Sequence, residues 1–202
     1  MGKYFGTDGF RGEANKDLNF EHAVKIGRFL GWYYGANQGK KAKIVIGKDT
    51  RRSSYMFEYA LCTGLMASGA DAYIMHVTTT PSVAYITRVD DFDCGIMISA
   101  SHNPYYDNGI KLFNGNGEKM DEETILKVED YIDGKLEIPV AEETVSDVPW
   151  IMLRDVTVIS DILSLIPSTD SRMSRSVSML QTVRHGRSPR EFLMLSEPRP
   201  MS

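Results

Sequence analysis

Hydrophobic positions in the first 135 residues alternate between helical and strand spacing. Apolar residues that recur every three or four positions indicate amphipathic helices, and short β-branched runs indicate strands. Helices are predicted over residues 20–34, 54–69, 80–89 and 121–132, and strands over residues 43–47, 71–77, 94–100 and 109–115. Strand and helix therefore follow one another along most of this region.

The expected helix starts carry residues that suit the first turn. Asn19 and Asp121 precede two of the helical patterns, and Ser53 or Ser54 precedes a third. Their side-chain oxygens can accept hydrogen bonds from the first free N–H groups of a helix. Pro81 lies in the first turn of the remaining helix, where its missing N–H costs nothing.

Alternating strands and helices predict an α/β fold. We expect a three-layer α/β/α sandwich, with a mixed, mostly parallel sheet between helices on its two faces. Crossover connections in such sheets are right-handed. The loops that do chemistry leave the carboxyl ends of the strands.

Composition narrows the class of protein without identifying its function. The chain has 202 residues, 42% of them hydrophobic and 25% charged, with a net charge of −4, so it offers no electrostatic case for nucleic acid or an anionic membrane. Cys62 and Cys94 support neither a disulfide framework nor a zinc site. No apolar run approaches the length of a membrane span, and the N-terminus lacks an apolar targeting segment. We therefore expect a cytoplasmic protein.

The amino-acid composition of the chain changes sharply near Pro149. Residues 1–148 contain 11 Lys, 5 Arg and 16 Gly, whereas residues 149–202 contain no Lys, 7 Arg, 1 Gly and 10 Ser. The later segment has no sustained period of either kind, which predicts a poorly structured tail that is disordered or out of reading frame. A solvated regulatory tail is the alternative. We expect one α/β domain over residues 1–148 and an atypical tail over residues 149–202.

Polar residues suited to phosphate follow two of the predicted strands. The strand at 43–47 leads into Lys48-Asp49-Thr50-Arg51-Arg52-Ser53, and the strand at 94–100 leads into Ser101-His102-Asn103. Lys111 returns shortly after Asn108-Gly109. Hydroxyls, backbone donors at helix starts and basic side chains are the groups that bind a phosphate dianion. Taken singly, these segments would be read as a polar turn and a solvated helix start.

Four motifs together resemble a known family. The segments are YFGTDGFRG at 4–12, IGKDTRRSS at 46–54, TTTPSVAYITR at 78–88 and GIMISASHNPYYDNGIKLFNGNGE at 95–118. In this order they resemble the first domain of the α-D-phosphohexomutases, over residues 1 to about 145. The resemblance, which is greatest to members acting on glucosamine phosphate, implies exchange of phosphate between the 6- and 1-positions of a hexosamine phosphate. It also implies a phosphoserine, a bisphosphate intermediate and Mg²⁺.

The resemblance assigns the catalytic roles. Ser101 corresponds to the family's phosphorylated serine, and its phosphate would carry about −1.5 to −2 charges and bind the Mg²⁺. His102 and Lys111 resemble residues that handle protons or stabilise the transferring phosphoryl group. Arg11 resembles a residue that lines the catalytic pocket.

Two further residues are assigned to phosphate or substrate. Arg51 resembles a pocket residue whose guanidinium suits phosphate. Asn103 is grouped with it as a substrate-binding position, although an asparagine there is also expected to shape the loop.

The resemblance covers only part of a family member. Members run to more than twice this length, and the motifs of their later domains do not occur in the sequence, so we expect this fragment to be inactive alone. A hexosamine phosphate is the expected partner, and a homodimer is expected of the full-length protein. Alternatives are a phosphomannomutase or phosphoglucomutase specificity, a non-catalytic sugar-phosphate-binding module, and a phosphatase-like hydrolase.

Overall fold

The computed structural model describes residues 2–139, and the predicted tail at 149–202 lies outside these residues. Within the described part, helices and strands alternate much as the hydrophobic pattern predicts. The strands are β1 (Phe5–Gly6), β2 (Gly9–Glu13), β3 (Lys43–Lys48), β4 (Asp71–Val77), β5 (Cys94–Ile98) and β6 (Asp107–Asn114). The helices are α1 (Phe20–Tyr34), α2 (Arg52–Ala67), α3 (Thr80–Val89) and α4 (Glu122–Ile132), with a 3₁₀ turn at Ala36–Gln38.

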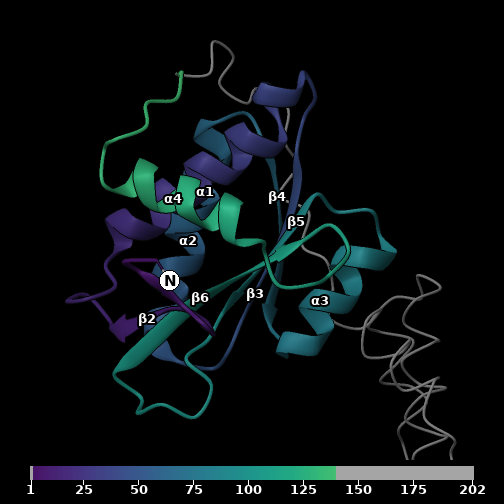
Figure 1. Ribbon diagram of the computed structural model, residues 1–202. Coiled ribbons are helices and arrows are strands. Elements are labelled where there is room, and N and C mark those ends of the chain that lie inside the picture. The colour runs from purple at the N-terminus through teal and green to yellow at the C-terminus, as the bar shows by residue number, and fades with distance from the viewer. Residues whose placement is uncertain (1, 140–202) are drawn as a thin grey trace, which may run out of the picture. The chain divides into compact units, whose positions relative to one another are not determined.

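All six strands form one sheet in the order β1-β2-β6-β5-β3-β4. Helices α1, α2 and α4 cover one face of the sheet, and α3 covers the other, where it contacts β3, β5 and β6 (Figure 1). The predicted α/β fold is therefore confirmed. No described helix is long and apolar enough to cross a membrane.

The sheet is mixed, but parallel pairing is limited to three strands. β3 pairs in parallel with β4 and β5, whereas the β5–β6, β6–β2 and β2–β1 pairs are antiparallel. The predicted mostly parallel pairing therefore holds only for β5, β3 and β4, at one edge of the sheet. The difference comes from β1 and β2, which the hydrophobic pattern did not predict because β2 buries only Phe10 of its five residues.

Most predicted helix starts are confirmed. The Asn19 side chain accepts a hydrogen bond from the His22 N–H at 2.9 Å, and Asp121 accepts one from the Thr124 N–H at 2.8 Å. The predicted Ser53 or Ser54 cap of α2 is wrong. Arg51 occupies the N-cap position without a side-chain cap, and the Ser54 hydroxyl donates to Asp49 instead.

Two glycines let α1 and α2 pack backbone to backbone. A Cβ at Gly64 would lie 2.1 Å from the Val24 carbonyl oxygen, and one at Gly27 would lie 2.4 Å from the Leu61 carbonyl oxygen. No side chain fits at either distance. This contact fixes the position of α2, whose first turn adjoins the predicted catalytic loop.

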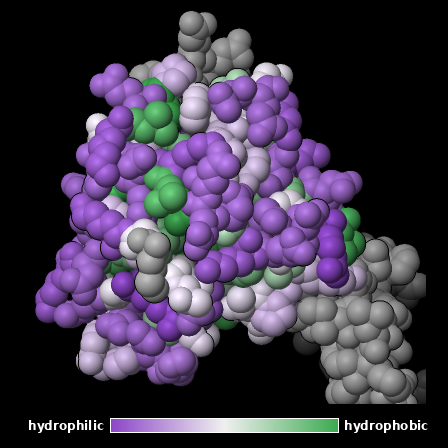
Figure 2. Space-filling model, in the orientation of Figure 1, coloured by the Kyte–Doolittle hydropathy of each residue, from purple (hydrophilic) through white to green (hydrophobic). Residues whose placement is uncertain are grey.

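The apolar side chains gather between the sheet and its helices. Every residue of β5 is buried, and β5 ends at Ile98, two residues earlier than predicted. The surface visible in Figure 2 is mostly polar, with small apolar areas between polar groups. β5 is thus a rigid support for the loop that follows it.

Candidate active site

Ser101 lies in the loop that leaves the buried end of β5. It is exposed, and its φ of 57° is in the left-handed region, which non-glycine residues rarely adopt. Ser99, two residues earlier, is buried, and its hydroxyl accepts a hydrogen bond from the Ser101 N–H at 3.0 Å. Of the two serines, only Ser101 could carry a solvated phosphate.

Arg51 holds this loop through its whole guanidinium group. Nη2 donates to the carbonyl oxygens of Ser101 at 3.0 Å and Asn103 at 2.9 Å. Nη1 donates to those of Asp107 at 3.2 Å and of Pro104, and Nε donates to Asp49 Oδ2 at 2.9 Å. An arginine has five N–H donors, so all are engaged. The predicted phosphate contact of Arg51 would require it to give up at least one of these bonds.

Arg11 retains free hydrogen-bonding capacity. It lies on β2 opposite Gly109 of β6, and its guanidinium donates to Asn103 Oδ1 at 3.4 Å and Asp8 Oδ2 at 3.2 Å. Its Nε is buried and has no acceptor among the described residues. Because a buried donor without a partner is costly, Arg11 is the better placed of the two arginines to accept an anion.

Asn103 connects Arg11 to the end of the loop. Its Oδ1 accepts the bond from Arg11, and its Nδ2 donates to Asp107 Oδ2 at 2.9 Å. This arrangement fits the expected loop-shaping role. Its predicted contact with substrate stays a prediction.

Lys111 lies on β6, one strand away from Arg11. Burial lowers the pKa of Lys111 below its usual value, and the Arg11 guanidinium lowers it further, while Asp8 and Asp49 act in the opposite direction. A lysine with a lowered pKa gives up its proton more readily than an ordinary lysine. His102 is exposed beside Ser101. Ser101, Arg11, Asn103 and Arg51 are linked by these contacts, whereas the proton-transfer roles of His102 and Lys111 stay predictions.

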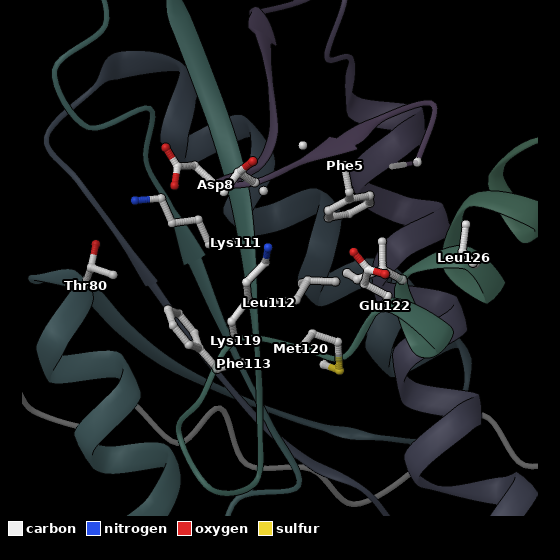
Figure 3. Close-up of a pocket in the computed structure, with 15 residues that line it drawn as sticks. Phe5, Asp8, Thr80, Lys111, Leu112, Phe113, Lys119, Met120, Glu122 and Leu126 are labelled. Carbon is white, nitrogen blue, oxygen red and sulfur yellow. The ribbon is translucent and has the colours of Figure 1, made fainter.

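A pocket of about 530 Å³ opens beside Lys111. Figure 3 shows Lys111, Asp8 and Thr80 in one part of it, and Phe5, Met120 and Leu126 in another. Lys119 and Glu122 also line the more apolar part, and Ser101 is not among the lining residues, so the pocket adjoins Lys111 but is not formed by the serine loop. A combination of polar and apolar lining can hold a small molecule by both kinds of contact.

The described residues do not supply a preformed site for the expected Mg²⁺. Among them, no group of three or more His, Cys, Asp or Glu side chains is placed to hold a metal ion. Mg²⁺ requires near-octahedral oxygen ligands, and the chain could offer it an oxygen of a phosphate on Ser101. The Mg²⁺ requirement stays a prediction.

Asp49 and Asp8 were not singled out from the sequence. Asp49 orients Arg51, and Asp8 pairs with Arg11. Both precede a predicted arginine by two or three positions, and that proximity is the signal that could have identified them.

Known proteins match this chain over its described residues. Residues 2–138 match the family Phosphoglucomutase/phosphomannomutase, alpha/beta/alpha domain I. The chain is 73% identical over 143 residues to a phosphoglucosamine mutase of Lachnospira eligens, covering 70% of this chain and 32% of that protein. It is 69% identical over 142 residues to a phosphoglucosamine mutase of Lachnoclostridium phytofermentans, covering 70% and 31%. The chain thus spans about a third of the length of these curated relatives.

Solved structures show the same fold at lower identity. A phosphoglucomutase/phosphomannomutase family protein of Burkholderia thailandensis superposes with a TM-score of 0.65 at 22% identity, covering 83% of this chain and 36% of that one. Parafusin, a phosphoglucomutase of Paramecium, superposes with a TM-score of 0.61 at 19% identity, covering 81% and 35%. Because residues 2–138 match its domain I, the chain belongs to the phosphoglucomutase/phosphomannomutase family.

Proposed function

We propose that this chain carries the phosphoserine part of a phosphohexomutase that interconverts glucosamine 6-phosphate and glucosamine 1-phosphate. The observation that carries the proposal is Ser101, exposed in the loop after the buried strand β5, where Arg51 binds the carbonyl oxygens of Ser101 and Asn103 and Arg11 donates to the Asn103 side chain. The similar proteins named phosphoglucosamine mutase support glucosamine as the sugar. Mannose or glucose phosphate is the alternative substrate.

The proposed reaction has two phosphoryl transfers. The 1-hydroxyl of glucosamine 6-phosphate attacks the phosphorus of phosphorylated Ser101, the bond from phosphorus to the serine oxygen breaks, and glucosamine 1,6-bisphosphate forms. The Ser101 hydroxyl then attacks the 6-phosphate and releases glucosamine 1-phosphate. In the second transfer the bond from phosphorus to the sugar 6-oxygen breaks. In each step the attacking hydroxyl gives its proton to a base and the leaving oxygen receives a proton from an acid, and His102 and Lys111 are the candidates for both roles.

The chain's own groups would act by position and charge. Phosphoryl transfer needs little covalent help from a protein, and positioning plus electrostatic stabilisation dominate. Arg11 has unpaired donors for the transferring group, and Lys111 adds a second positive charge when protonated. Mg²⁺, when bound, would neutralise part of the phosphate charge.

Phosphate uptake tests the proposal. The full chain incubated with glucosamine 1,6-bisphosphate and Mg²⁺ should gain one phosphate, which peptide mapping should locate on Ser101. Ser101→Ala should gain none, because Ser99 is buried and a phosphate on it would be out of contact with water. Phosphate on Ser99, or equal uptake by Ser101→Ala, would contradict the mechanism.

The same incubation separates the other candidate functions. A sugar-phosphate-binding module would bind the bisphosphate without covalent uptake, and a phosphatase-like hydrolase would release inorganic phosphate continuously. The expected uptake is a single transfer to Ser101. We expect no catalytic turnover between the two monophosphates by this chain alone, since it spans about a third of the length of its relatives. A cytoplasmic location and a homodimer of the full-length protein stay predictions.

Lys111→Met should slow phosphate uptake at Ser101 by roughly 10²-fold or more, because it removes the ammonium and keeps the aliphatic stem. The thermal midpoint should hardly change. Lys127→Met is the matched control, since Lys127 lies on the exposed side of α4 in an ion pair with Glu123. Uptake by Lys111→Met at the rate of this control would exclude Lys111 from the chemistry.

A further inference from the structure

The loop that carries Ser101 is anchored at both ends to the start of α2. The first anchor is Arg51, whose guanidinium engages four loop carbonyls. Asp49 orients this arginine twice: Oδ2 accepts from Nε at 2.9 Å, and Oδ1 accepts from the Arg51 backbone N–H at 3.0 Å. Asp49 is itself fixed, since its N–H donates to the carbonyl of Ile98, the last residue of β5, at 2.9 Å.

The second anchor is Asn108, which is fully buried at the start of β6. Its Nδ2 donates to the hydroxyls of Ser53 and Ser54 at 2.9 Å each. The Ser54 hydroxyl in turn donates to Asp49 Oδ1 at 2.8 Å. Asp49 therefore joins both anchors into one hydrogen-bonded network.

The backbone of Ser101 explains why such a network is needed. A positive φ at a serine is disfavoured and persists only where the surroundings over-determine it. Arg51 binds the carbonyl oxygen of Ser101 itself, which restricts the rotation of that peptide unit. Without an oriented Arg51, the loop could relax and move the hydroxyl.

We propose that Asp49 is a positioning residue for phosphate transfer at Ser101. It acts by aiming the Arg51 guanidinium at the loop, and the proposal rests on the phosphohexomutase function given above. Its effect should fall on the transfer step, because a nucleophile displaced by about 1 Å can lose about 10²-fold in rate.

Asp49→Asn in the full chain tests this role. The maximal rate of phosphate uptake from glucosamine 1,6-bisphosphate should fall about 10-fold or more, while the half-saturating concentration changes little. In hydrogen exchange, the amides of residues 101–107 should exchange at least about 10-fold faster, and those of β5 should keep their protection. Asp130→Asn is the matched control, because Asp130 forms an exposed ion pair with Lys135.

Arg51→Lys serves as a second variant. It keeps the positive charge but loses the planar fork that reaches several carbonyls at once. It also leaves the Asp49 carboxylate, which acts on the pKa of Lys111, in place. The same loss of maximal rate and of loop protection is expected. If Asp49→Asn lowers the hydrogen-exchange protection of β5, the rate and loop exchange of Arg51→Lys decide whether the contact between Asp49 and Arg51 positions Ser101.

Failure of the proposed function and failure of the positioning role of Asp49 would give different results. Absence of phosphate uptake by the unaltered chain would overturn the proposed function, while loop exchange in Asp49→Asn would still decide whether Asp49 holds the loop. Unchanged loop exchange and an unchanged maximal rate in both variants would overturn the positioning role.

Discussion

Glu58→Gln is expected to lower the free energy of unfolding by about 3–5 kcal/mol, because it leaves the ammonium of Lys48 buried without a counter-charge. Lys48 on β3 and Glu58 on α2 form an ion pair in which both side chains are fully buried. The ring of Tyr55 also lies close to the ammonium, with its centroid 3.6 Å away, and His76 Nδ1 lies 3.4 Å from the same carboxylate oxygen of Glu58. Urea denaturation followed by circular dichroism measures the change.

The double variant Lys48→Met with Glu58→Leu is the control. It removes both charges and keeps similar volumes, so its stability should lie close to that of the unaltered chain or above it. The Glu58 environment favours this result, since Oε1 is buried without a partner among the described residues. A cost below about 1 kcal/mol for Glu58→Gln would mean that water or a shifted side chain compensates Lys48.

Glu129→Ala is expected to cost about 3 kcal/mol or more, because each hydrogen bond to a charged group contributes about 1.5–3 kcal/mol. Glu129 on α4 is buried, and its carboxylate accepts the backbone N–H groups of Lys3 and Tyr4 at 2.8 Å each and of Phe5 at 2.7 Å. Removing it would leave the start of β1 without acceptors. Urea denaturation again gives the magnitude.

Glu123→Ala is the matched control on the same helix. Glu123 is exposed and pairs with Lys127, so the change should leave the stability almost unaltered. Hydrogen exchange should also show faster exchange of the β1 and β2 amides in Glu129→Ala. Equal stability of the two variants would contradict the anchoring role of Glu129.

Local signals in the sequence were sufficient for the helices and for the strands they alternate with. The predicted bounds of α1 and α3 agree with the structure because each has an apolar stripe and a residue suited to a helix start, and those of β4 agree because its apolar residues form one short run. A polar loop at Ser101 after a buried strand was predicted from the same kind of local pattern, although β5 ends two residues earlier than predicted, and the catalytic role of Ser101 came from the family resemblance. These features depend on neighbours only a few residues away.

The remaining features depend on distant partners. β2 is held by pairing with β6, almost one hundred residues later, and its own side chains show no strand alternation. Arg51 was predicted to bind phosphate, but the carbonyl groups that engage it belong to a loop about fifty residues away. Every residue has a backbone carbonyl group, so residue types do not show which carbonyls will bind Arg51. For this reason neither the contact of Arg51 with the loop nor the role of Asp49 could be predicted from the sequence.

The contact between Glu129 and the first strand also bears on the order of folding. The hydrogen bonds from residues 3–5 to Glu129 span 124 to 126 positions, so the start of β1 cannot complete its contacts until α4 exists. At ribosomal rates of about 5–20 residues per second, this segment waits roughly 6–25 s for its partner. Arg11 lies on β2, whose partner strand β6 is made before α4, so Arg11 and the serine loop are expected to come together before the chain start is fixed by Glu129.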